Sequence, residues 1–211
     1  MSSIVVFGAN GATGRALVEE ALRAGHTVTA AVRDPAAFPR PAADPARLSV
    51  VRADVRDLDG VRAAVRGHDA VVSAVGPAGA RADGLYSAAA RAFVAAMGEH
   101  GVDRLVALSS SGVRLDDPDH PLWYRVVART LLKDLYQDMR RMERIVRDSP
   151  LDWTFVRSTR IVDGPPTGTC RVVDSANPAN GRRVNRADLA RFVVGAVTDP
   201  RWSRRHPTPA R

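Results

Sequence analysis

The 211-residue chain contains a single cysteine, Cys170, and no apolar run near the roughly 20 residues that a membrane-spanning helix needs. One cysteine excludes an internal disulfide and a metal site built from cysteines alone. The five histidines are far apart, so we expect no metal site. The N-terminal segment MSSIVVFGAN lacks the basic region of a secretory signal peptide. We therefore expect a soluble, cytoplasmic protein that does not contact a membrane.

Lysine and aromatic residues are also scarce. Lys133 is the only lysine among 31 basic residues, which leaves 31 − 1 = 30 arginines, and aromatic residues make up 5% of the chain. The formal net charge is +8, but arginines and acidic residues are interleaved, as between Arg52 and Arg62. Single-strand nucleic-acid binding needs a basic groove lined with aromatic side chains. We therefore expect no nucleic-acid partner, and we expect a few arginines to bind the phosphate of a cofactor.

Short apolar runs rich in β-branched residues alternate with helical patterns along the whole chain. Strands that are apolar on both faces are typical of a parallel sheet covered by helices on both sides. We predict one α/β domain over residues 1–211 with a doubly wound parallel sheet flanked by helices, and a small substrate-side region from about 158–185. The expected strands are Ile4–Phe7, Thr27–Val32, Leu48–Val51, Ala70–Val75, Leu105–Leu108 and Trp153–Val156, with a further extended piece at Cys170–Val173.

The expected helices lie between these strands and after the last of them. A long pattern places Leu131, Leu135, Met139, Met142 and Val146 on one face, and the last helix has Asn185 at its N-cap. The long segment has more apolar positions than a one-sided surface helix needs. We expect part of it to cover a substrate cleft or to form a dimer contact. The expected helices are Thr13–Ala24, Asp57–Arg66, one that starts near Leu85 and is closed by Gly101, Leu122–Arg147, and one that follows Asn185.

A glycine-rich segment, Gly8-Ala9-Asn10-Gly11-Ala12-Thr13-Gly14, directly follows the first expected strand and opens the first helix. Gly8 permits a tight turn, Gly11 lets backbone N–H groups approach a pyrophosphate, and Gly14 allows close packing of helix and strand. The N-terminus of the helix can then bind the anion. The pattern predicts a dinucleotide site with cofactor contacts from Gly8, Asn10, Gly11, Ala12, Thr13 and Gly14.

The spacing Gly-x-x-Gly-x-x-Gly and the blocks AVRDP, RADVRD, DAVVSAVG, GVDRLVALSSSG, LDWTFVRSTRIVDGPPTG and VNRADLARFV extend over nearly the whole chain. This series resembles the atypical short-chain dehydrogenases/reductases, in particular their NAD(P)H-binding, NmrA-like group and its biliverdin reductase B type of flavin reductase. The resemblance implies a Rossmann-type domain and an NAD(P)H cofactor. It implies no particular substrate.

The end of the second strand bears on the choice between NAD and NADP. An acidic residue there binds the ribose hydroxyls of NAD, whereas an arginine pairs with the 2′-phosphate of NADP. Arg33 occupies the position that the resemblance gives to this arginine, and Asp34 follows it. We favour Arg33 as the phosphate ligand and Asp34 as the start of a turn with Pro35, hence NADP(H). An NAD site at Asp34 and a purely solvated Arg33 remain the alternatives.

Further cofactor contacts follow from the resemblance alone. Asp54 and Val55 match the pair that flanks the adenine, although Asp54 is equally suited to capping a turn. The small residues Ala74-Val75-Gly76 match the segment beside the cofactor ribose, although they also suit any tight turn after a strand. At the end of the fifth strand, Ser109 matches a cofactor contact.

The catalytic groups are less clearly marked. Short-chain dehydrogenases usually carry Tyr-x-x-x-Lys, but the residue four positions after each tyrosine here is not lysine. Tyr136, followed by Arg140, is the nearest match and a possible proton donor, or else a packing residue on a helix. Ser110 matches the family serine near the nicotinamide, or else caps the strand end. Ser111, Thr159 and Arg160 are expected in the substrate region, although Arg160 could instead pair with Asp163.

These observations predict an NADPH-dependent oxidoreductase that reduces a small conjugated or carbonyl acceptor such as a flavin, quinone or ketone. Two alternatives remain because the Tyr-x-x-x-Lys pair is missing. One is a non-catalytic dinucleotide-binding sensor or interaction protein, and the other is a biosynthetic isomerase or cyclase on the same fold. We expect a small-molecule substrate as the partner, and a monomer or homodimer.

Overall fold

The computed structural model describes residues 1–39, 45–79, 81–114 and 122–211. Its centre is a six-stranded parallel sheet with the strand order β3-β2-β1-β4-β5-β6. The order reverses at β1, which pairs with β2 on one side and with β4 on the other. The strands are β1 (Ser3–Phe7), β2 (Thr27–Val32), β3 (Leu48–Arg52), β4 (Ala70–Ser73), β5 (Arg104–Ser110) and β6 (Asp152–Ser158).

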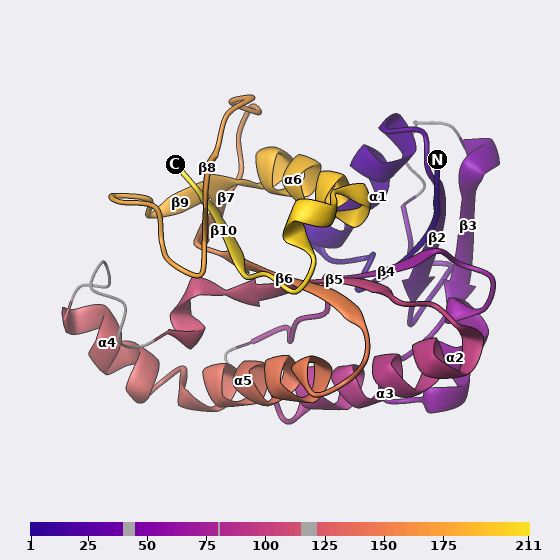
Figure 1. Cartoon of the computed structure of the whole chain (residues 1–211), viewed down its shortest axis with the longest axis horizontal. Coiled ribbons are helices and arrows are strands. Elements are labelled where there is room, and N and C mark those ends of the chain that lie inside the picture. Colours follow the sequence, from indigo (N-terminus) through magenta and orange to yellow (C-terminus); the bar gives the residue numbers. More distant parts are fainter. Residues whose placement is uncertain (40–44, 80, 115–121) are drawn as a thin grey trace.

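Helices cover both faces of the sheet, as Figure 1 shows. Helices α1 (Ala12–Arg23) and α6 (Arg186–Thr198) lie on one face, and α2 (Leu58–Val65), α3 (Leu85–His100) and α5 (Lys133–Arg147) lie on the other. Strand β1 shows why: Ile4 and Val6 pack with the α1 and α6 side chains, whereas Val5 and Phe7 pack with α2, α3 and α5. The predicted doubly wound α/β fold is therefore confirmed.

The prediction of one long helix over Leu122–Arg147 is wrong in one respect, because this segment forms two helices, α4 (Leu122–Arg129) and α5. The Thr130 hydroxyl donates a hydrogen bond to the Val126 carbonyl, and the Leu132 amide bonds the Val127 carbonyl five residues back. Leu131 lies in this turn and is 76% exposed, so it is not part of the inward stripe. Val126 is also exposed.

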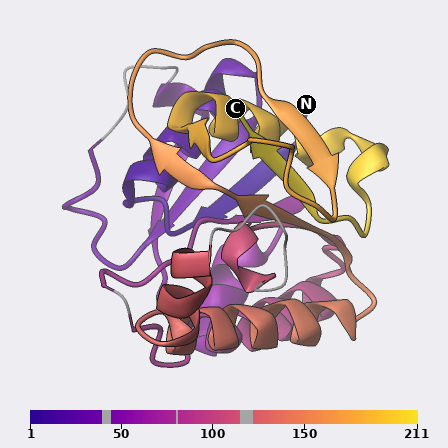
Figure 2. The ribbon, with the colours of Figure 1, turned by 90° about the vertical axis from the view of Figure 1, so that its left-hand side faces the viewer.

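The chain after β6 contains strands that the sequence pattern only partly predicts. β7 (Arg160–Val162) pairs in parallel with β9 (Arg183–Asn185), and β8 (Arg171–Asp174) pairs antiparallel with β10 (Pro207–Ala210). Figure 2 shows the segment with β7 and β8 above the sheet, and α4 and α5 below it. The described short 3-10 helices are Pro45–Arg47, Ser111–Val113 and Pro200–Trp202.

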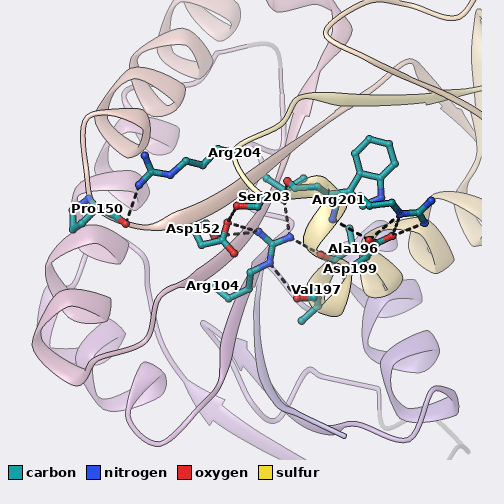
Figure 3. Close-up of polar contacts among 11 residues, drawn as sticks. Arg104, Pro150, Asp152, Ala196, Val197, Asp199, Arg201, Ser203 and Arg204 are labelled. Atoms are coloured by element: carbon teal, nitrogen blue, oxygen red, sulfur yellow. Dashed lines mark hydrogen bonds and ion pairs between the residues drawn. The ribbon is translucent and has the colours of Figure 1, made fainter.

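The amino ends of β5 and β6 are joined to the C-terminal end of α6 by Arg104 (Figure 3). Its guanidinium donates hydrogen bonds to the carbonyls of Ala196 and Val197, which are among the last of the helix and lack partners within it. It also donates to the Asp152 carbonyl and the Thr154 hydroxyl. This arginine therefore fixes α6, whose other end lies beside the glycine-rich loop.

We expect Arg104→Met to lower the free energy of unfolding by on the order of 2–3 kcal/mol, because four acceptors lose a charged donor in a partly buried place. Urea unfolding followed by circular dichroism measures the change. Arg91→Met is the matched control, since Arg91 is exposed on α3. Equal stability of the two variants would show that Arg104 is not a structural link.

Candidate dinucleotide site

The glycine-rich loop between β1 and α1 has the geometry that its three glycines require. Gly8 has a φ of +73°, and a Cβ there would lie 2.6 Å from the Ala74 carbonyl oxygen of the neighbouring strand end. A Cβ on Gly14 would overlap the Gly8 carbonyl. Gly11 differs, because it is exposed and the nearest atom to its Cβ position is the Gly8 oxygen at 3.4 Å. Gly8 and Gly14 are therefore needed for packing, whereas Gly11 faces outward.

The N-terminus of α1 is open at this loop. Gly11 is the N-cap and supplies no side-chain hydrogen bond, so the N–H groups of Ala12 and Thr13 have no capping side chain. Arg15 donates to the carbonyl and side-chain oxygens of Asn10 and thereby fixes the loop before the helix. Free N–H groups and the helix dipole together form a binding site for an anion such as a pyrophosphate.

Strand β2 is a neighbour of β1 in the sheet, and β3 follows it at the edge. Arg33 is exposed directly after β2, and no acidic side chain within the described ranges pairs with it. The Asp34 carboxylate accepts a hydrogen bond from the Ala36 amide at 3.0 Å and so closes the turn at Pro35. After β3, Asp54 caps a turn by accepting from the Arg56 amide at 2.9 Å, while Val55 is buried in the core.

The end of β4 brings a second backbone segment against the glycine-rich loop. The Ala74 amide donates to the Phe7 carbonyl at 2.9 Å, and the Ala74 carbonyl lies against Gly8. Val75 is half-buried and Gly76 is exposed. The Tyr86 hydroxyl lies near this turn, 3.5 Å from the position of a Cβ on Gly76. Burial, and next the neighbouring Asp138 carboxylate, raise the pKa of Tyr86 to about 12, so it stays protonated.

The three serines at the end of β5 have different surroundings. The buried Ser109 donates its hydroxyl proton to Glu143 at 2.8 Å, which directs this side chain toward α5. Ser110 accepts a hydrogen bond from the Gly112 amide at 3.1 Å and is half-buried. Ser111 is buried. Unlike Ser109, Ser110 retains a hydroxyl proton that it can donate at the carboxyl edge of the sheet.

Tyr136 and Arg140 lie on α5 beneath this strand end. Tyr136 is 6% exposed. Arg140, which stands where short-chain dehydrogenases have lysine, donates from its Nε atom to the Val113 carbonyl at 2.9 Å. The arginine therefore holds the backbone turn that follows Ser110.

Of the residues expected in the substrate region, Ser111 follows β5, whereas Thr159 and Arg160 lie just before β7 and at its start. Thr159 is 9% exposed, and its hydroxyl has no hydrogen-bond partner in the part of the chain that the structure describes. Arg160 is exposed at the start of β7. Asp163, considered above as a partner of Arg160, instead pairs with Arg186 at 2.7 Å. Sequence reasoning missed Arg186, which the structure places close to the glycine-rich loop.

A buried ion pair lies next to Ser109. Arg157 on β6 and Glu143 on α5 are joined at 2.7 Å, with side-chain exposures of 11% and 4%. His206 packs its ring against Trp153 and Phe155, and its Nε2 atom is buried without a partner among the described residues. Burial, and next the positive charge of Arg157, lower the pKa of His206 to about 4.

We expect this histidine to make the fold sensitive to mild acid. Because its folded-state pKa is below the ordinary 6.5, the stability it confers is complete above pH 6.5 and is lost as the pH falls toward 4. Urea unfolding at pH 7.5 and pH 5 measures the loss. His206→Phe should lose less stability between these pH values than the original protein. An equal loss in both would assign the pH dependence to other groups.

The fold and the open glycine-rich loop define a Rossmann-type dinucleotide-binding protein. A family model of NAD(P)H-binding proteins matches residues 8–200, and the chain belongs to this family of atypical short-chain dehydrogenases/reductases. The resemblance seen in the sequence is thereby confirmed at the level of the family.

Solved structures are similar over the whole chain. A Burkholderia pseudomallei protein with the provisional name exported protein is 27% identical, with a TM-score of 0.80 and 100% of both chains covered. A Veillonella parvula short-chain dehydrogenase/reductase in complex with NADP is 17% identical, with a TM-score of 0.79, covering 100% of this chain and 95% of that one. A Streptococcus pneumoniae protein provisionally named NADH-flavin reductase is 23% identical, with a TM-score of 0.79, covering 100% and 99%.

None of the helices described is both long and apolar enough to span a bilayer. No group of three or more histidine, cysteine, aspartate or glutamate side chains in the described ranges is arranged to hold a metal ion.

Proposed function

We propose that this protein is an NADPH-dependent reductase of a small conjugated or carbonyl acceptor. The observation that carries the proposal is the open N-terminus of α1 at Gly11, with the exposed Arg33 following the adjacent strand β2. The helix N-terminus suits the pyrophosphate, and Arg33 suits a 2′-phosphate. The fold relative from Veillonella parvula, which was solved with NADP, supports the same cofactor class.

The residues at the site divide into binding and proton-donating groups. Ala12 and Thr13 would hold the pyrophosphate through backbone N–H groups, whereas the Gly11 N–H bonds the Gly8 carbonyl and Gly11 leaves room for the anion to approach. When bound, the cofactor supplies a hydride from its nicotinamide ring. The chain must then orient the acceptor and polarise or protonate it. Ser110 is suited to this, because its oxygen accepts from Gly112 while its own proton remains available. Tyr136 is the second hydroxyl that we propose near the acceptor.

The substrate region would be formed by Ser111, Thr159 and Arg160. Thr159 has a hydroxyl without a partner among the described residues, and Arg160 is an exposed cation at the start of β7. A cation at this place would attract an anionic acceptor. We propose a small molecule as the partner. A monomer or homodimer is the assembly we expect, and light scattering of the purified protein measures it.

A non-catalytic sensor is the second candidate, and one contact favours it. Arg140 holds the Val113 carbonyl and so does not act as the lysine of a Tyr-x-x-x-Lys pair. A protein with this arrangement could bind NADPH and signal its presence without turnover. An isomerase or cyclase on the same fold is the third candidate.

A panel of flavins, quinones and aldehydes tests the three candidates. We expect the absorbance of NADPH at 340 nm to fall in the presence of the protein and at least one acceptor, with one NADPH consumed for each acceptor reduced by two electrons. Ser110→Ala should lower the rate constant of this reaction and leave the dissociation constant of NADPH unchanged. Tight NADPH binding with no oxidation by any acceptor would contradict the reductase and favour the sensor.

A further inference from the structure

Arg186 is the first residue of α6, and its side chain reaches from the start of this helix to the glycine-rich loop. Its Nη1 atom donates to the Thr13 hydroxyl at 2.6 Å. Its Nε and Nη2 atoms donate to the two carboxylate oxygens of Asp163 at 2.7 and 3.3 Å. The Arg186 side chain is 21% exposed, so it is held in place and still reaches solvent.

Thr13 lies in the first turn of α1, whose N–H groups form the proposed pyrophosphate site. The guanidinium is therefore separated from that site by a single hydroxyl group. An arginine has five N–H donors, and the contacts with described residues use three of them. Two N–H groups of the guanidinium thus remain for an anion at the helix N-terminus.

The surroundings of Arg186 keep it in this position. Asn185 donates from its side-chain amide to the carbonyls of Gly164 and Pro165 at 2.9 and 3.0 Å. The buried Asp188 accepts from the Thr167 and Gly168 amides, both at 3.0 Å. These contacts bind the loop after β7 to the start of α6. Asp163, at the beginning of the same loop, completes the support by pairing with the guanidinium.

The carboxylate of Asp163 orients Arg186 without sealing it from an anion. The Asp163 side chain is 80% exposed, and the hydrogen bonds from Arg186 lower its pKa. It therefore remains charged at neutral pH and fixes the plane of the guanidinium. An exposed carboxylate is well hydrated, so its pairing with Arg186 is weak enough for a phosphate to share the same cation.

We propose that Arg186 binds the pyrophosphate of the dinucleotide, at the phosphate nearer the nicotinamide, as a second cation beside the backbone N–H groups of α1. The proposal rests on the dinucleotide site proposed above. The nicotinamide side is assigned because Asp163 and Arg186 belong to the chain after β6, whereas Arg33 follows β2 on the opposite side of β1. Arg186 thereby binds the group that NADPH and NADH share, and Arg33 binds the group that distinguishes them.

Titrations of Arg186→Ala with three ligands test the proposal. We expect the affinities for NADPH and NADH to fall by a similar factor of about ten or more, because both carry the pyrophosphate. The affinity for adenosine 2′,5′-bisphosphate should stay within about twofold. This ligand has the 2′-phosphate and the 5′-phosphate next to the adenosine, but it lacks the phosphate nearer the nicotinamide. Arg186→Lys keeps the charge and loses the planar fork, so it should give an intermediate loss.

Asp163→Asn tests the support of the guanidinium. It removes the carboxylate that orients Arg186 and keeps the cation, so the affinity for NADPH should fall, but by a smaller factor than in Arg186→Ala. Circular dichroism of each variant reports folding. If Arg186→Ala and Arg186→Lys both bind NADPH as tightly as the original protein, the inference is wrong. The inference is also overturned if Arg186→Ala lowers the affinity for adenosine 2′,5′-bisphosphate by the same factor as the affinity for NADPH. If the original protein itself binds no dinucleotide, the proposed function fails instead.

Discussion

Gly11→Val is expected to abolish NADPH binding in a protein that still folds. The glycine is exposed at the N-cap of α1, and the nearest protein atom to its Cβ position is 3.4 Å away. A valine side chain therefore meets little resistance from the protein itself. It does occupy the path by which a pyrophosphate approaches the backbone N–H groups. Fluorescence titration with NADPH, together with circular dichroism, measures both parts of this expectation.

Gly14→Ala is the contrasting variant. Its added Cβ overlaps the Gly8 carbonyl, which is part of the backbone, so we expect loss of stability rather than a selective loss of ligand. Comparing Gly11→Val with Gly14→Ala distinguishes a glycine needed for ligand binding from a glycine needed for packing in the same loop. A folded Gly11→Val protein that binds NADPH with unchanged affinity would remove the cofactor site from this loop.

Arg33→Ala should weaken NADPH binding far more than NADH binding. A hydrogen bond between an arginine and a phosphate contributes about 1.5–3 kcal/mol, or roughly ten- to a hundredfold in affinity. NADH has no 2′-phosphate, so its affinity should change little. Because Arg33 is exposed, the preference for NADPH should also shrink as the salt concentration rises.

Calorimetric titration of both cofactors at two salt concentrations measures these effects. Arg66→Ala is the matched control, since Arg66 is an exposed arginine at the end of α2, and it should leave both affinities unchanged. A variant at Arg33 that loses NADPH and NADH equally would show that this arginine holds the fold instead of reading the phosphate.

Local patterns were sufficient to predict most of the sheet. The run Thr27–Val32 coincides with β2, and Asn185 caps α6 by accepting from the Ala187 amide at 2.8 Å. The turn at Asp34 also follows from local chemistry, because aspartate before proline readily bonds an amide two residues on. Apolar runs of β-branched residues and capping side chains act over a few residues, and such signals are visible in one sequence.

Contacts between distant residues could not be predicted in this way. Nothing near Ser109 in the sequence indicates that its hydroxyl faces Glu143, which lies 34 positions later. The contact between Thr13 and Arg186 spans 173 positions. Strand β10 was missed because two prolines, Pro207 and Pro209, interrupt the pattern of a strand, yet they suit the short two-stranded sheet that β10 forms with β8.

The affinities of the original protein for NADPH and NADH, measured side by side by calorimetry, test the central claim most directly. Arg33 is exposed and Asp34 is engaged with the Ala36 amide, so we expect NADPH to bind at least about tenfold more tightly. Tighter binding of NADH would make Asp34 the ribose ligand and contradict the assignment of Arg33. Binding of neither cofactor would contradict the dinucleotide site itself.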